Sequence, residues 1–136
     1  MADPERPVLI VDDDEGIREL LSIVLKKEGY AVETAVDEEE GLRKAQALRP
    51  ALIVLDLMLP RYGGFEVLRQ LQNSEMGKTP IVVVTGRYTD PSTADLIRQE
   101  SNVVELLEKP VKTARFVATV NKVLRPGPVA GGAPES

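Results

Sequence analysis

The fold is decided by residues 8–14, VLIVDDD, where four apolar residues are followed directly by three aspartates. The apolar run does not alternate with polar residues, which is typical of a strand buried on both faces of a parallel sheet. Runs of the same kind recur at 52–55 and 81–84. Three such strands predict a parallel sheet covered by helices on both faces.

Between these runs, apolar residues recur every three or four positions, which is the period of an amphipathic helix. The first such segment covers 17–25, with Asp14 placed to cap its start and Gly29 its end. A second helix begins at Asp37 and Glu40, which have capping-box spacing, and stops at Pro50. Two more strands are predicted at Tyr30–Thr34 and Val103–Leu107, and two more helices at Phe65–Asn73 and from Asp90-Pro91 to about Glu100. A last helix has an apolar face made of Phe116, Val117, Val120, Val123 and Leu124.

Five strands alternating with five helices predict a doubly wound α/β sandwich, whose ligands bind at the carboxyl ends of the strands. The 136 residues suffice for one domain, which we expect over 6–124, followed by a tail or linker over 125–136 that is rich in Pro, Gly and Ala. The absence of Cys and His excludes disulfides, thiolate or imidazole zinc sites and His-dependent triads.

The charge and hydropathy of the chain predict where it works. With a net charge of −5 and no basic cluster, direct binding to nucleic acid is not expected. No apolar run approaches the roughly 20 residues that cross a bilayer, and the polar N-terminus has no export-signal pattern. We therefore expect a cytoplasmic protein that does not enter the membrane.

Chemically useful residues follow the predicted strands. Asp12-Asp13-Asp14 comes after the first strand, Asp56 after the third, Thr85 after the fourth and Lys109 after the fifth. Because parallel strands end at one edge of the sheet, these side chains are expected to converge there. Clustered carboxylates repel one another unless a cation lies among them, and an all-oxygen site suits Mg²⁺.

Each of these residues also has an ordinary structural interpretation. Asp14 is expected to cap a helix, and Asp56 alone could be a turn residue. A single Thr at a strand end and a single Lys on the surface are commonplace. As a set, however, cation-binding carboxylates, an Asp nucleophile, a hydroxyl and an ammonium are the groups that phosphoryl transfer to a carboxylate requires.

With these residues, the sequence resembles the receiver domain of two-component response regulators over about residues 6 to 124. The resemblance implies the flavodoxin-like receiver fold, with five helices around a five-stranded parallel sheet. It is carried by four strings at the ends of the predicted strands, which are Val8–Asp13, Val54–Pro60, Thr85-Gly86 and Lys109-Pro110.

The resemblance implies that Asp56 accepts a phosphoryl group from a phosphohistidine of a sensor histidine kinase or phosphotransfer protein, or from a small acyl phosphate. It also implies that Mg²⁺ is bound by Asp13, Asp56 and the backbone carbonyl of Met58, with Asp12 orienting a water molecule on the ion. Such a domain is a phosphoacceptor that assists its own modification rather than an enzyme with turnover.

The remaining motif residues have implied roles as well. Lys109 would neutralise one phosphoryl oxygen and Thr85 would hydrogen-bond another, with the Gly86 N–H close by. The peptide before Pro110 is predicted to be cis by the same resemblance. An inward shift of Thr85 would then rearrange the fourth helix and fifth strand, which form an output surface for a downstream protein or effector domain.

Three further positions concern the switch or the lifetime of the acyl phosphate. Leu106 stands where a switch aromatic is usual, which leaves coupled switching with Thr85 open. Met58 and Arg87 occupy positions that tune the lifetime of the acyl phosphate, and neither is a carboxylate or amide that could position water. Slow autodephosphorylation is expected.

Two alternatives remain open. The first is a receiver fold that serves as a docking or dimerisation module without phosphorylation, which Leu106 favours and the intact site set disfavours. The second is a phosphatase with an Asp-x-Asp nucleophile at Asp12 and Asp14. Gly16 does not fit that pattern, and the chain lacks the insertion that such enzymes usually carry.

Overall fold

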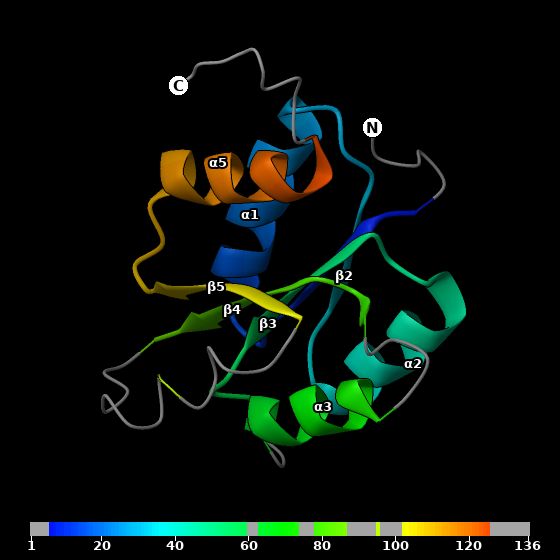
Figure 1. Cartoon of the computed structure of the whole chain (residues 1–136). Coiled ribbons are helices and arrows are strands. Elements are labelled where there is room, and N and C mark those ends of the chain that lie inside the picture. Colours follow the sequence, from blue (N-terminus) through cyan, green and yellow to red (C-terminus); the bar gives the residue numbers. More distant parts are fainter. Residues whose placement is uncertain (1–5, 60–62, 74–77, 87–94, 96–101, 126–136) are drawn as a thin grey trace.

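The structure is a computed structural model that describes residues 6–59, 63–73, 78–86, 95 and 102–125, with only the backbone described at 63–65. Within these residues the five strands form one parallel sheet in the order β2-β1-β3-β4-β5 (Figure 1). The elements are β1 (Val8–Val11), α1 (Glu15–Lys27), β2 (Val32–Ala35), α2 (Glu38–Leu48), β3 (Leu52–Asp56), α3 (Gly63–Gln72), β4 (Ile81–Thr85), β5 (Val103–Glu108) and α5 (Thr113–Leu124).

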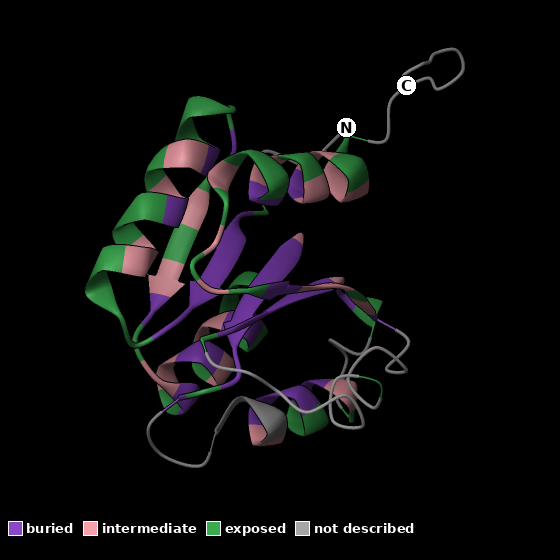
Figure 2. Ribbon diagram, turned by 90° about the vertical axis from the view of Figure 1, so that its left-hand side faces the viewer, coloured by how far each residue is buried: buried purple, intermediate pink, exposed green. Residues whose placement is uncertain are grey.

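The sheet lies between two layers of helices, α1 with α5 on one face and α2 with α3 on the other (Figure 1). Successive residues of β1 alternate between the two cores: Leu9 and Val11 face α2 and α3, whereas Val8 and Ile10 face α1 and α5. Figure 2 shows the central strands as buried throughout. The predicted α/β sandwich is thus confirmed, and its central strands are buried on both faces as expected.

The helix ends agree with their predicted caps. Asp14 begins α1, and its Oδ1 accepts from the Ile17 N–H at 3.1 Å. Asp37 begins α2 in the same way, with Oδ1 accepting from the Glu40 N–H at 2.9 Å. Gly29 follows α1 with a φ of 96°, a conformation that favours glycine.

Some boundaries differ from the predicted ones. β2 begins at Val32 instead of Tyr30, because the Tyr30 N–H closes the end of α1 on the Leu25 carbonyl and its ring is buried against α1 and α5. Helix α3 begins at Gly63 instead of Phe65, and α5 covers Thr113–Leu124, which contains the predicted apolar face. The helix expected over 90–100 lies outside the described residues except Asp95, which is helical.

Helix α2 packs very closely on β1. A Cβ atom at Gly41 would lie 2.8 Å from Val11 Cγ1, so only glycine fits here without movement. Val11 is the residue immediately before Asp12, and this contact therefore fixes the strand end from which the acidic loop leaves. No helix in the described part of the chain has both the length and the apolar character needed to cross a membrane.

Candidate functional site

Strand register brings the candidate residues to one edge of the sheet. Val11 pairs with Leu55, so the next residues, Asp12 and Asp56, lie side by side where β1 and β3 end. The sheet order changes direction between these two strands, and ligands of such sheets bind at that point. The site is therefore where the topology predicts it.

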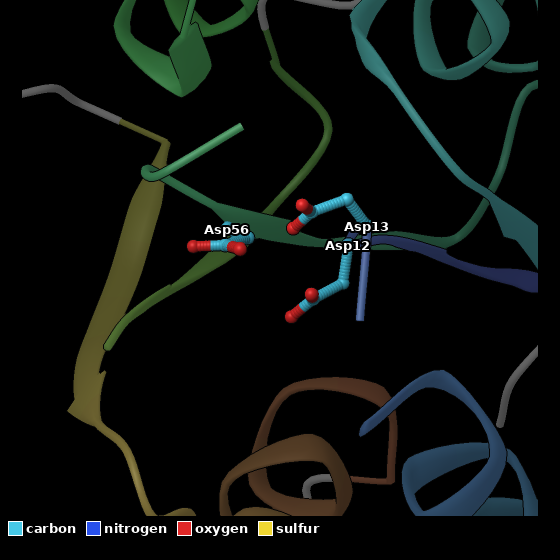
Figure 3. A group of neighbouring side chains, drawn as sticks. All are labelled: Asp12, Asp13 and Asp56. Atoms are coloured by element: carbon cyan, nitrogen blue, oxygen red, sulfur yellow. The ribbon is translucent and has the colours of Figure 1, made fainter. Parts of the chain in front are cut away.

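Three carboxylates meet at this edge. Asp12 and Asp13 extend to the side of their backbone on which Asp56 lies (Figure 3), and one oxygen from each of the three lies within 4.8 Å of the others. Asp12 is 3% exposed and Asp56 is 2% exposed, whereas Asp13 is exposed. The cluster thus has two buried carboxylates at its base and one at its solvent side.

Lys109 joins the two buried carboxylates. Its Nζ lies 3.0 Å from Asp12 Oδ2 and 3.3 Å from Asp56 Oδ2. The backbone places it there, because its N–H donates to the Thr85 carbonyl at 2.8 Å directly after β5. The peptide bond from Lys109 to Pro110 is cis, the isomer implied by the resemblance.

Burial and charge act against each other at these groups. Burial raises the pKa of Asp12, and the Asp56 charge adds to the rise, although hydrogen bonds from the Asp14 N–H and Lys109 oppose it. Burial by itself would lower the pKa of Lys109, but contacts with Asp12 and Asp56 outweigh burial and raise it. Lys109 is therefore a firmly protonated ammonium at neutral pH.

Backbone N–H groups orient both buried carboxylates. Asp12 Oδ1 accepts from the Asp14 N–H and Asp56 Oδ1 accepts from the Met58 N–H, each at 2.9 Å. Each carboxylate is thus fixed by one backbone N–H and by Lys109. The two groups are held before any ligand arrives, which lowers the reorganisation that binding would require.

Thr85 and Gly86 complete the edge beside Lys109. Thr85 ends β4, is 2% exposed and pairs with Glu108, the residue before Lys109. A Cβ at Gly86 would lie 3.3 Å from Lys109 Cδ, so the lysine stem passes close to this backbone. The residues after β4 and β5 therefore share one face of the site.

Comparison with known proteins agrees with this arrangement. A family model described as the response regulator receiver domain matches residues 8–121. The chain belongs to this family. The transcriptional regulatory protein AfsQ1 of Streptomyces coelicolor is 37% identical over 120 residues, 88% of this chain and 52% of AfsQ1. The alkaline phosphatase synthesis transcriptional regulatory protein PhoP of Bacillus subtilis is 36% identical over 130 residues, 96% of this chain and 53% of PhoP.

The receiver domain spans about half the length of these curated relatives. Among solved structures it resembles a response regulator receiver protein from Pseudomonas putida with a TM-score of 0.80 and 34% identity, covering 86% of this chain and 97% of that one. Chemotaxis response regulator CheY4 of Vibrio cholerae gives a TM-score of 0.78 and 34% identity, with 88% and 98% covered.

The donor set of this receiver domain fits a divalent cation. Three carboxylates and the ammonium of Lys109 leave two net negative charges in a partly buried site. Burying uncompensated charge is unfavourable, and a hard dication with oxygen ligands would balance it. Among the described residues, Asp12, Asp13 and Asp56 are the carboxylates that could hold Mg²⁺ together.

Other predicted residues of the receiver domain have different surroundings. The Met58 side chain is 60% exposed beside Asp56. Leu106 is half-buried and packs on the core beneath α2 and α3, so this position contributes aliphatic packing. Asp14 serves as the helix cap expected of it. Arg87 lies outside the described residues.

Reasoning from the sequence missed Arg18. Its Nη1 donates to the backbone carbonyl of Asp12 at 2.8 Å, which connects α1 to the acidic loop. Only its spacing on the helix, four residues after the cap Asp14, could have suggested that it lies over this loop. Because every residue has a backbone carbonyl, a hydrogen bond to one gives no recognisable pair of residue types in the sequence.

Proposed function

We propose that this receiver domain accepts a phosphoryl group on Asp56 in two-component signalling. The observation that carries the proposal is the position of this carboxylate, 2% exposed at the end of β3, beside Lys109 and two further aspartates. Receiver domains of response regulators act as phosphoacceptors without substrate turnover. This chain has a described residue for each role in phosphoryl acceptance that we assign below.

In the proposed step, a carboxylate oxygen of Asp56 attacks the phosphorus of a phosphohistidine or of a small acyl phosphate. A P–O bond forms to Asp56 as the P–N or P–O bond to the donor breaks, and the donor leaves with that electron pair. The product is an aspartyl phosphate. The chain's contribution is to orient the nucleophile and stabilise charge on the transferred oxygens.

Lys109 is suited to that stabilisation because its ammonium already contacts Asp56 at 3.3 Å. We assign it to one phosphoryl oxygen, and the Thr85 hydroxyl with the Gly86 N–H to another. Mg²⁺, held by Asp12, Asp13, Asp56 and the Met58 carbonyl, would supply further neutralisation of phosphoryl charge. Asp12 and Lys109 are in contact at 3.0 Å, so the acidic and basic groups act as one unit.

Modification would add about −1.5 to −2 charges at a site that already has excess negative charge. The addition would draw Lys109 and Thr85 toward the phosphoryl group and bias β4 and β5, on which they lie. A sensor histidine kinase or phosphotransfer protein is the proposed donor, and a downstream protein or effector domain the proposed recipient of the signal. A cytoplasmic location stays a prediction.

Two observations bear on the alternatives. Leu106, packed in the core, favours a switch without an aromatic residue, and a docking module that is never phosphorylated would show the same packing. The Asp-x-Asp phosphatase is disfavoured because the Asp14 carboxylate accepts from the Ile17 N–H as a helix cap. Turnover of a generic phosphate ester would support that enzyme and count against the receiver proposal.

Intact mass after incubation with acetyl phosphate tests the proposal. We expect one phosphoryl adduct that requires Mg²⁺ and is lost in Asp56→Asn. Asp37→Asn is the matched control, because asparagine also caps helices and Asp37 is the cap of α2 and not a member of the carboxylate cluster. No adduct, under conditions that modify another receiver domain, would favour the docking module instead.

A further inference from the structure

The peptide that joins Asp12 to Asp13 connects two of the three clustered carboxylates. Asp12 and Asp13 leave the chain in opposite directions (Figure 3), as consecutive residues of a strand do, yet one oxygen of each lies within 4.8 Å of an Asp56 oxygen. β1 ends at Val11 and the chain bends at Asp13. The peptide between the two aspartates therefore lies where the strand passes into the bend, and its orientation sets the direction in which each carboxylate leaves the chain.

Arg18 holds this peptide. The Asp12 N–H still follows the sheet, donating to the Ala35 carbonyl at 3.1 Å. The Asp12 carbonyl belongs to the next peptide, which turns toward α1, and it accepts from Arg18 Nη1 at 2.8 Å. Since this carbonyl and the Asp13 N–H share one planar unit, a bond to the carbonyl restrains both residues.

The restraint comes from a rigid element. Arg18 is the fourth residue of α1, where its own N–H donates to the Asp14 carbonyl at 3.0 Å. The Asp14 N–H in turn donates to Asp12 Oδ1 at 2.9 Å. Arg18 and the loop thus form a closed set of bonds, in which the side chain spans from the helix back to the strand end.

We propose that Arg18 is a positioning residue for the divalent-cation site, acting through the Asp12 carbonyl to keep the carboxylates of Asp12 and Asp13 directed at Asp56. The inference rests on the proposed function, because it concerns the same site. Arg18 contacts the loop backbone, and its role does not require contact with the cation or the phosphoryl group.

Electrostatics alone predicts the opposite effect. A guanidinium next to a cation site repels the cation, so its removal would tighten binding if charge were the main influence. If Arg18 positions the carboxylates, its removal weakens binding. Residues that orient metal ligands typically change affinity by about 10- to 100-fold. The direction of the change therefore separates the two roles.

The experiment is calorimetric titration of the folded, metal-free domain with Mg²⁺. We expect Arg18→Ala to raise the dissociation constant about ten-fold, and Arg18→Lys, which keeps a donor and the charge, to raise it less. Arg43→Ala is the matched control, because it removes the same charge from an exposed position on α2 and should leave the constant nearly unchanged.

The unfolding midpoint without Mg²⁺ provides a second readout. A purely structural role would lower this midpoint in Arg18→Ala while leaving the Mg²⁺ dissociation constant of the folded domain unaltered, and that pattern would overturn the inference. Tighter binding in Arg18→Ala would overturn it too. Absence of Mg²⁺ binding by the unsubstituted domain would instead overturn the proposed function, and the inference with it.

Discussion

Replacing Lys109 with methionine removes the ammonium that contacts both buried carboxylates, at 3.0 Å from Asp12 and 3.3 Å from Asp56. At an effective dielectric constant of about 20, each contact contributes about 5 kcal/mol of Coulomb attraction. Desolvation of the three groups offsets much of this, and removing one partner of a buried pair typically costs about 3–5 kcal/mol. Because Lys109 keeps 17% of its side-chain surface exposed, we expect the free energy of unfolding to fall by about 3 kcal/mol, the lower end of that range.

The loss should depend on pH. Burial already raises the pKa of Asp12 in the folded state, so this residue stabilises the fold at low pH and loses that contribution as pH rises through its folded pKa. Without Lys109, the pKa of Asp12 should rise further, because a lowering contact is gone. The free energy of unfolding lost in the variant should therefore be largest at neutral pH and should shrink as pH falls and Asp12 takes up a proton.

Urea unfolding without Mg²⁺, followed by far-ultraviolet circular dichroism, measures this difference. Lys112→Met is the matched control: its side chain is exposed at the start of α5, so we expect a change within about 0.5 kcal/mol. In an Asp12→Asn, Asp56→Asn background the Lys109 substitution should cost much less. A loss that is equal in both backgrounds, or that does not vary with pH, would refute the electrostatic account.

Three further substitutions test local contacts of the fold, each by urea unfolding. Gly41→Ala places a Cβ 2.8 Å from Val11 Cγ1 and should cost about 1–3 kcal/mol despite better helix propensity, and no loss would mean that α2 can move away from β1. Asp14→Ala removes the cap of α1 and should cost about 1 kcal/mol, a cost that should disappear if water replaces the cap equally well. Tyr30→Phe leaves Asn121 without the hydroxyl that donates to it and should also cost about 1 kcal/mol, while equal stability would show that this bond contributes nothing net.

The parts of the fold that could be predicted from the sequence are those where buried residues form a regular apolar pattern along the chain. β1, β3 and β4 are buried on both faces, so their apolar runs were located almost to the residue. The edge strand β2 is short and only partly buried, with Glu33 exposed, so its pattern does not separate it from Tyr30, which precedes it. The Tyr30 ring is buried for a different reason, because it packs against α1 and α5.

Some features of the site could likewise be predicted from the sequence, and others could not. The meeting of Asp12, Asp56 and Lys109 at one edge follows from parallel topology and could be predicted, since strand ends share an edge. That Lys109 contacts both carboxylates depends on side-chain conformation and on the close passage of its stem over Gly86. Arg18 was missed because it binds a backbone carbonyl, which any residue carries.

The central claim is that Asp56 is the residue phosphorylated. Reduction of the acetyl phosphate-treated domain with borohydride converts an aspartyl phosphate to homoserine, and peptide sequencing by mass spectrometry then locates it. We expect homoserine at Asp56, only in samples treated with Mg²⁺. Homoserine at Asp12, Asp13 or Asp14 with aspartate retained at Asp56 would contradict it.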